Sequence, residues 1–187
     1  MNYIVDNPFF LTIMLNKIIS GGQTGVDQAA LEAALQWGIP IGGWCPPGRV
    51  CETGLIPEKY PLKETPVETS NGAPDVPRSL RTEWNVRSSN ATLVLQPTSA
   101  PIDKGTGWTI ATAIRYTKPY LVADPFEDGA AMSIANWLGN TPCGILNVAG
   151  PAESNAPGIG EICFELMTKV LHSVSNGQRP GFHVEKP

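Results

Sequence analysis

The sequence predicts an α/β fold in which helices cover both faces of a parallel sheet. Segments with strand character alternate with helical patterns along most of the 187 residues. The run ATLVLQ at 91–96 is almost entirely apolar, as expected of a parallel strand that is buried on both faces. A glycine-rich turn joins the first strand to the first helix, which is a recurrent arrangement in such sheets.

The first unit is a strand at 17–20 followed by a helix at 24–37. Two isoleucines make the strand β-prone, while alanines and leucines supply the small and apolar positions of the helix, with Thr24 as its expected cap. A short strand is expected at 40–43. The next stretch, 44–77, is rich in proline and glycine and predicts a long irregular loop. Loops of this length inside a domain are usually functional or disordered, and its contact-forming side chains favour a functional one.

The second half of the chain continues the alternation. Proline suits the first turn of a helix, so a helix is expected at 77–88, before the buried strand. A second glycine turn, Lys104 to Gly107, precedes a predicted helix. The later elements are helices at 108–116, 128–138 and 157–174 and strands at 119–123 and 144–149.

Three polar turns follow predicted strands, at 20–27, 96–109 and 147–158. Ligands of open parallel sheets bind at the carboxyl ends of the strands, where the topology switches. The sequence therefore predicts that these turns meet around a binding site.

We expect a single domain at 17–174, with an N-terminal extension at 1–16 and a flexible tail at 175–187. The apolar run within the extension is too short for a membrane span, and no basic residue precedes it as in a signal peptide. The net charge is -4 and no basic run occurs, which argues against nucleic-acid binding.

The four cysteines form no C-x-x-C pair and have no zinc-ligand spacing to the two histidines, so no metal site is predicted. Reduced and mostly buried thiols are the expectation, as is usual in a cytoplasmic protein. Cys45 and Cys51 flank a proline- and glycine-rich loop and are the two thiols expected to be reactive.

The run SGGQTGVD at 20–27 predicts an anion site. Glycine lets backbone N–H groups approach an anion, and the helix N-terminus adds free donors and a partial positive charge. The run matches neither the dinucleotide fingerprint nor the P-loop. The alternative is a tight strand-to-helix turn that only requires glycine.

Other candidate residues have two interpretations each. Arg81, Thr82 and Asn85 fall within about one helical turn and form either an anion-binding face or a solvated one. Arg49 is a phosphate clamp or an exposed loop arginine, and Asn147 is a cap or a ligand contact. No Ser/His/Asp arrangement and no G-x-S-x-G elbow are present, so no catalytic residue is predicted.

Several motifs together resemble the molybdenum-cofactor carrier proteins, a Rossmann-like family related to the lysine-decarboxylase-like phosphoribohydrolases. The resemblance covers Lys17 to Leu171 and is carried by SGGQTGVDQAALEAA, GWCPPGRVCETG, IPEKYPLKET, RTEWNVRSS, KGTGWT and NVAGPAESNAPGI. It implies a Rossmann-like parallel sheet with helices on both faces and a cytoplasmic homo-oligomer, commonly a tetramer. It also implies binding, storage and protection of the molybdenum cofactor (molybdopterin with molybdate), with molybdoenzymes and cofactor-synthesis proteins as partners.

By the family motifs, the resemblance implies a set of cofactor-binding residues: Gly21, Gly22, Gln23, Thr24, Gly25, Asp27, Arg49, Glu52, Arg81, Thr82, Asn85, Gly105, Thr106, Thr109, Asn147 and Ser154. The terminal phosphate is expected at the Gly21–Thr24 turn, with the dithiolene under the long loop. The chain departs from the family pattern at Ala152, where an arginine is usual, and at Ser89-Asn90, where an aspartate is usual.

The related hydrolases carry the signature P-G-G-x-G-T-x-x-E, and Thr109 stands where the glutamate would be. The missing carboxylate favours a binding protein without catalysis of its own. Two alternatives remain open at this point: a nucleotide N-glycosidase, and a module that senses a nucleotide or ADP-ribose.

Overall fold

The computed structural model describes residues 15–176. Most of the predicted N-terminal extension (1–14) and of the predicted tail (177–187) lies outside the described residues. Among the residues that are described, no helix is long and apolar enough to cross a bilayer.

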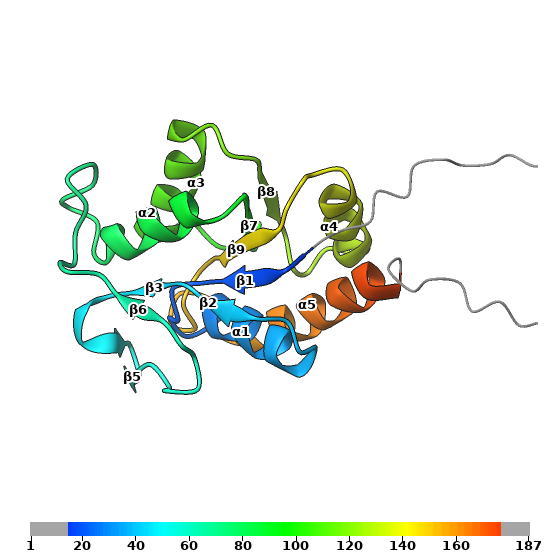
Figure 1. Ribbon diagram of the computed structural model, residues 1–187, viewed down its shortest axis with the longest axis horizontal. Coiled ribbons are helices and arrows are strands. Elements are labelled where there is room, and N and C mark those ends of the chain that lie inside the picture. The colour runs from blue at the N-terminus through cyan, green and yellow to red at the C-terminus, as the bar shows by residue number, and fades with distance from the viewer. Residues whose placement is uncertain (1–14, 177–187) are drawn as a thin grey trace, which may run out of the picture.

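A five-stranded sheet with the strand order β2-β1-β9-β7-β8 forms the centre of the molecule (Figure 1). Its strands are β1 (Lys17–Ile19), β2 (Ile41–Gly42), β7 (Ala91–Leu95), β8 (Tyr120–Ala123) and β9 (Ile145–Ala149). Every pairing in this sheet is parallel, with Ile18 opposite Leu146 and Leu93 opposite Val148. The predicted Rossmann-like α/β class is thereby confirmed.

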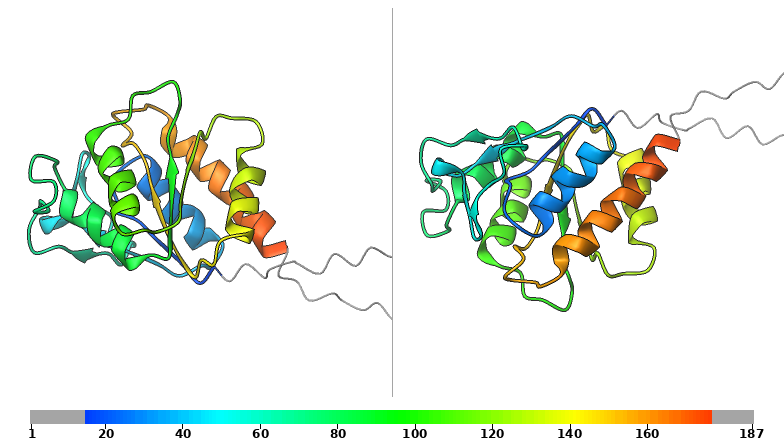
Figure 2. Two further views of the ribbon diagram at one scale, coloured as in Figure 1. Left: turned by 90° about the horizontal axis from the view of Figure 1, so that it is seen from above. Right: turned by 90° about the horizontal axis from the view of Figure 1, so that it is seen from below.

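Helices cover both faces of the sheet. On one face, α5 (Ile159–Asn176) packs against both α1 (Val26–Gln36) and α4 (Ala130–Gly139), and Figure 2 shows α1 and α5 side by side. On the other face, α2 (Ser79–Ser88) packs against α3 (Lys104–Arg115).

The main core lies between the sheet and the α1, α4 and α5 layer. Ile18, Leu93 and Leu146 of the sheet and Met167 and Leu171 of α5 are completely buried. Burying a side chain of this size contributes roughly 1.5–3 kcal/mol relative to leaving it exposed. The core therefore holds the carboxyl ends of the strands in a defined arrangement.

The stretch at 44–77, predicted to be irregular, contains short regular elements between residues 44 and 64. Its elements are β3 (Trp44–Cys45), a 3-10 turn (Pro47–Arg49), β4 (Val50–Cys51), β5 (Gly54–Leu55) and β6 (Lys63–Glu64). β3 pairs in parallel with β6, and β4 pairs antiparallel with β5. Strands of two residues leave no periodicity to detect, which explains why the sequence did not reveal them.

A second apolar cluster fixes this stretch on α1. It joins Leu31 of α1 to Cys45, Cys51, Ile56, Tyr60 and Leu62. Arg49 has a φ of 53° and donates hydrogen bonds to the carbonyl oxygens of Leu62, Tyr60 and Pro57 at 2.9, 3.0 and 3.2 Å. Arg49 therefore joins the start of the stretch at 44–77 to residues 57–62 of the same stretch.

The starts of α1 and α3 differ from prediction in a way that affects the candidate site. Thr24 does not cap α1, because the cap position belongs to Gly25, which has a φ of 73° and no side chain to contribute. The second glycine turn is not a turn, because Lys104 to Gly107 form the first turn of α3. Asp103 caps that helix by accepting the N–H groups of Gly105 and Thr106 at 2.8 and 3.0 Å.

All four cysteines are free and buried, as expected for structural thiols. The prediction that Cys45 and Cys51 are reactive is wrong, because both pack into the second apolar cluster. Burial raises the pKa of Cys45, and it raises the pKa of Cys143 to about 11. The thiolate is the reactive form of cysteine. Burial therefore lowers reactivity in two ways, because it limits access of a reagent to the sulfur and because it disfavours the charged thiolate.

Candidate functional site

A pocket of about 320 Å³ lies at the carboxyl edge of the sheet. Its walls come from the segments after β1, β7 and β9 and from the starts of α2 and α3. The lining residues are Gln23, Asp27, Pro77, Arg78, Arg81, Thr82, Asp103, Lys104, Gly105, Thr106, Thr109, Ala149, Gly150, Ala152 and Asn155. Both the volume and the position are typical of a small-molecule site in an open parallel sheet.

An ion pair between Asp27 of α1 and Arg81 of α2 lies in this pocket. Nη1 of Arg81 is 2.9 Å from Oδ2 of Asp27, and the N–H of Gln23 donates to the same oxygen at 3.2 Å. A Cβ on Gly21 would stand only 1.8 Å from that nitrogen of Arg81. Glycine at position 21 therefore makes room for the guanidinium group.

Asp27 is buried and Arg81 is largely buried, with exposed side-chain fractions of 3% and 15%. Burial raises the pKa of Asp27, and the nearby Arg81 charge only partly opposes the effect. Nε of Arg81 is buried and has no hydrogen-bond partner among the described residues. A buried donor without an acceptor is costly, so this part of the Arg81 side chain carries a desolvation cost in the described residues.

Two further cations lie in positions that carry a cost for the fold. Arg78 precedes α2 with a φ of 58°, and Lys104 is the first residue of α3. A left-handed conformation costs about 1 kcal/mol in a residue with a Cβ, and a cation at a helix N-terminus opposes the helix dipole. Both residues line the pocket, so an anionic ligand would compensate for these costs.

Three threonines add hydroxyl groups to the walls. Thr82 donates to the carbonyl oxygen of Arg78 at 3.3 Å, Thr106 to the carboxylate of Asp103 at 2.9 Å, and Thr109 to the carbonyl oxygen of Gly105 at 3.1 Å. Their hydrogens are engaged, but each oxygen keeps acceptor capacity. The pocket therefore offers cations to an anion and acceptors to the N–H groups of a polar ring.

Seven of the residues predicted from the sequence meet in this pocket: Gln23, Asp27, Arg81, Thr82, Gly105, Thr106 and Thr109. The other predicted residues do not line it: Gly21, Gly22, Thr24, Gly25, Arg49, Glu52, Asn85, Asn147 and Ser154.

The first glycine turn is not the open anion cradle that the sequence suggested. The N–H groups of Gln23 and Thr24 already donate to Oδ2 of Asp27 and Oε1 of Gln23. A Cβ on Gly22 would meet the side chains of Leu62 and Ile56 in the second apolar cluster, so this glycine faces protein. A substitution there would disturb the packing before it could obstruct a ligand.

Asn85 and Asn147 hold elements together. The Asn85 amide accepts the N–H of Trp44 at 2.8 Å and donates to its carbonyl oxygen at 2.9 Å, which ties α2 to β3. Nδ2 of Asn147 lies 3.3 Å from the hydroxyl of Thr92, between β9 and β7. Neither side chain reaches the pocket.

Glu52, Thr24 and Ser154 form a cluster beside the pocket. The Glu52 carboxylate accepts hydrogen bonds from both hydroxyls and from the N–H of Ser154, the last at 3.1 Å. Partial burial works against the charge, but the bonds from Ser154 and Thr24 outweigh it and lower the pKa of Glu52. The cluster connects the turns after β1 and β9 to the segment between β4 and β5.

The predicted set lacked several residues that line the pocket, among them Arg78, Asp103 and Lys104. Asp103 had a detectable signal, because an aspartate three residues before Thr106 matches an N-cap pattern. Arg78 had none, because Pro77 suggested an earlier helix start and hid the left-handed residue that follows it.

Comparisons with known proteins agree with this architecture. A model of the circularly permutated YpsA SLOG family matches residues 18–171. A crystal structure from Syntrophus aciditrophicus SB, described as that of a "Putative molybdenum carrier protein", is 37% identical and superposes with a TM-score of 0.76. The match covers 84% of this chain and 96% of the other. A search of curated proteins finds no match.

Proposed function

The chain belongs to the circularly permutated YpsA SLOG family, and from this premise we propose that its pocket binds the molybdenum cofactor. The cofactor is held as cargo, protected and delivered to molybdoenzymes, without catalysis by the protein. The observation that carries the proposal is the group of three cations, Arg78, Arg81 and Lys104, that line one pocket at the carboxyl edge of the sheet. The similar structure described as that of a "Putative molybdenum carrier protein" supports this class of cargo.

The chemistry of the pocket suits the parts of this cargo. Molybdopterin combines a phosphate with a pterin ring and a dithiolene that holds molybdate. Arg78, Arg81 and Lys104 provide positive charge for the anionic groups, and charge-assisted hydrogen bonds of this kind are the strong ones. The threonine oxygens provide acceptors for the N–H groups of the pterin.

The pocket carboxylates favour binding over hydrolysis. Asp27 is paired with Arg81, and Asp103 caps α3, so both carboxylates already have partners. Thr109 occupies the position of the hydrolase glutamate and donates to its own helix. These engagements support binding of a ligand rather than its hydrolysis.

We further propose that the protein acts as a homotetramer in the cytoplasm, with molybdoenzymes and cofactor-synthesis proteins as partners. Ile114 of α3 and Tyr120 and Val122 of β8 are exposed by 59%, 38% and 41%, which supports an interface at this edge of the sheet. Light scattering is expected to give four times the chain mass of 20.0 kDa. A monomeric mass would contradict the tetramer and leave the pocket proposal intact.

The test of cargo binding is protection of the cofactor in air. Purified protein is mixed with freshly released molybdenum cofactor, and surviving cofactor is measured by reconstitution of a cofactor-free nitrate reductase. We expect prolonged survival with the wild-type protein. Decay at the rate seen without protein would overturn the proposal, and a thermal-shift panel with AMP, NAD and ADP-ribose would then test the nucleotide functions.

Arginine at position 152 is expected to strengthen cargo binding. Ala152 lines the pocket, and Ala152→Arg adds a fourth cation there. One charge-assisted hydrogen bond contributes about 1.5 kcal/mol, so the Kd for the cofactor should fall by roughly tenfold. Ala152→Met is the control, because it adds length without charge. Equal affinities of the two variants would show that charge at position 152 does not act on the ligand.

A further inference from the structure

The carboxylate of Glu52 lies among hydrogen-bond donors that come from two other segments. The hydroxyl of Thr24 follows β1, whereas the N–H and the hydroxyl of Ser154 follow β9. The N–H of Glu153 donates to the Thr24 hydroxyl oxygen at 3.3 Å and so orients that hydroxyl toward Glu52. We call Thr24 Oγ1, Ser154 N–H and Ser154 Oγ the donor nest.

The donor nest shares a wall with the pocket. Gln23 lines the pocket, and its Oε1 accepts the N–H groups of Thr24 and Glu52 at 3.1 and 3.0 Å. Ala152 and Asn155 line the pocket on either side of Ser154 in the chain. The nest therefore adjoins three residues of the pocket wall, Gln23, Ala152 and Asn155.

The donor nest already binds an anion, the carboxylate of Glu52. Two hydroxyls and one backbone N–H converging on a carboxylate are the donors that would also suit phosphate oxygens. Arg78 adds a positive charge that lowers the pKa of Glu52, so this pocket residue acts electrostatically on whatever anion fills the nest. Two anions would repel each other there, so an external phosphate has to replace the carboxylate.

We propose that the donor nest is the phosphate subsite of the pocket, and that Glu52 occupies it until the phosphate of the cargo displaces its carboxylate. This inference rests on the proposed function, because it assumes a phosphate-bearing ligand in the pocket. It assigns Thr24 and Ser154 to the phosphate and makes Glu52 an internal competitor rather than a ligand-binding group.

The exposure of the segment that carries Glu52 would allow its carboxylate to leave the nest when phosphate binds. Residues 52–55 are exposed, while Cys51 and Ile56 on either side are buried in the second apolar cluster. The carboxylate can leave the nest without unpacking these two anchors. Return of the carboxylate would promote release of the phosphate, and an unphosphorylated pterin would not displace Glu52.

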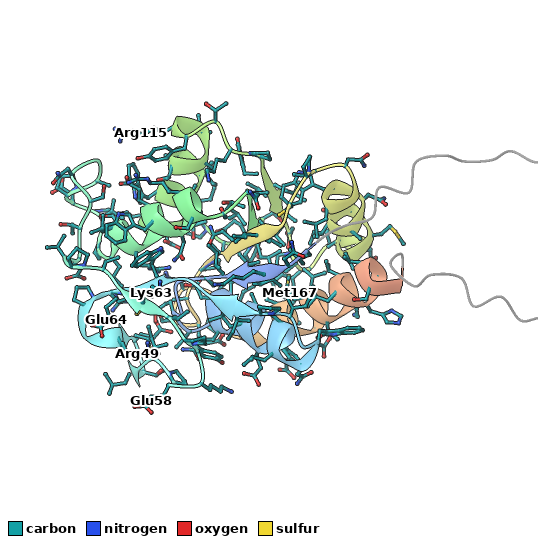
Figure 3. All side chains as sticks on the ribbon, viewed as in Figure 1. Arg49, Glu58, Lys63, Glu64, Arg115 and Met167 are labelled. Atoms are coloured by element: carbon teal, nitrogen blue, oxygen red, sulfur yellow. The ribbon has the colours of Figure 1, made fainter. Side chains whose placement is uncertain are left out.

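Chemical rescue by inorganic phosphate tests the proposal. Glu52→Ala empties the nest, and its Tm is expected to fall below that of the wild-type protein in phosphate-free buffer. Added phosphate should then raise the Tm saturably and by more than in the wild-type protein, because a ligand that binds only the folded state stabilises it. Glu58→Ala is the control, since Glu58 is an exposed glutamate on the same stretch (Figure 3) and should show no such gain.

A second pair of variants locates the effect. Ser154→Ala and Thr24→Val, each combined with Glu52→Ala, remove donors and should reduce or abolish the rescue. An equal rise of Tm in the wild-type protein and in Glu52→Ala would overturn the proposal, as would rescue that survives both donor replacements.

If Glu52→Ala does not fold, Glu52→Gln keeps the shape and removes the charge. A phosphate titration followed by phosphorus NMR should then show that Glu52→Gln binds phosphate about tenfold more tightly than the wild-type protein. This factor is expected if the Glu52 carboxylate leaves the wild-type nest open about a tenth of the time.

These outcomes separate the inference from the proposed function. Cofactor protection by the wild-type protein without phosphate rescue of Glu52→Ala would overturn the subsite and leave the carrier function standing. Rescue without cofactor protection would support the phosphate subsite and assign it to a different phosphate-bearing cargo.

Discussion

Arg81→Met is expected to abolish retention of the molybdenum cofactor. The substitution removes the buried cation from the pocket and leaves the carboxylate of Asp27 without its 2.9 Å partner. Losing a charge-assisted hydrogen bond to the cargo costs about 3 kcal/mol, which corresponds to a loss of affinity on the order of a hundredfold. The measurement is cofactor survival in air, together with the Kd.

The same variant should acquire a distinctive pH dependence of stability. Burial already raises the pKa of Asp27 above 3.8, and loss of Arg81 removes the charge that opposes this rise. The folded protein then holds a proton that the unfolded chain releases. Stability is therefore fully present below the unfolded pKa and decreases as the pH rises toward the folded pKa. Arg81→Met should unfold at a lower denaturant concentration at pH 8 than at pH 5.

The double variant Asp27→Asn, Arg81→Met is the matched control. The amide does not titrate, so the extra pH dependence should disappear while cofactor binding stays lost. If the double variant retains the pH dependence of the single one, Asp27 is not its source. If Arg81→Met protects the cofactor as well as the wild-type protein does, the guanidinium group is not part of the cargo site.

Gly25→Ala is expected to cause a large loss of stability. Gly25 has a φ of 73°, and a Cβ there would stand 2.7 Å from the carbonyl oxygen of Pro151 and 2.8 Å from the nitrogen of Glu153. Both contacts are with backbone, which cannot move aside as a side chain could. Backbone strain combined with such a clash places the loss at about 3 kcal/mol or more. Equilibrium unfolding in urea measures it.

Gly38→Ala separates strain from clash. Gly38 has a similar φ of 67°, but nothing lies within 4 Å of the position of its Cβ. Its substitution should therefore cost only the left-handed conformation, about 1 kcal/mol. Similar losses of unfolding free energy in Gly25→Ala and Gly38→Ala would mean that the turns after β1 and β9 can move apart at little cost. The contact between these turns would then not be needed to hold the pocket wall.

The order of elements could be predicted from the sequence because strands and helices are local patterns. The buried run of β7 was apparent from its apolar residues, and the turn before α1 was apparent from its glycines. The parallel alternation then implied that the turns after the strands share one edge of the sheet. Asp27 and Thr106 belong to these turns, whereas Arg81 was expected at the same site from the family resemblance, and all three line the pocket.

Only the tertiary structure decided which of these groups pair with each other and which remain free for a ligand. Asp27 and Arg81 are 54 positions apart, and no local pattern reports a contact over that distance. The sequence indicated donors at the first glycine turn, but folding supplied acceptors from Asp27, Gln23 and Glu52. Helices and strands depend mainly on residues that are close in the sequence. Whether a hydrogen-bond donor is paired within the protein or free for a ligand depends on which distant segments pack against it.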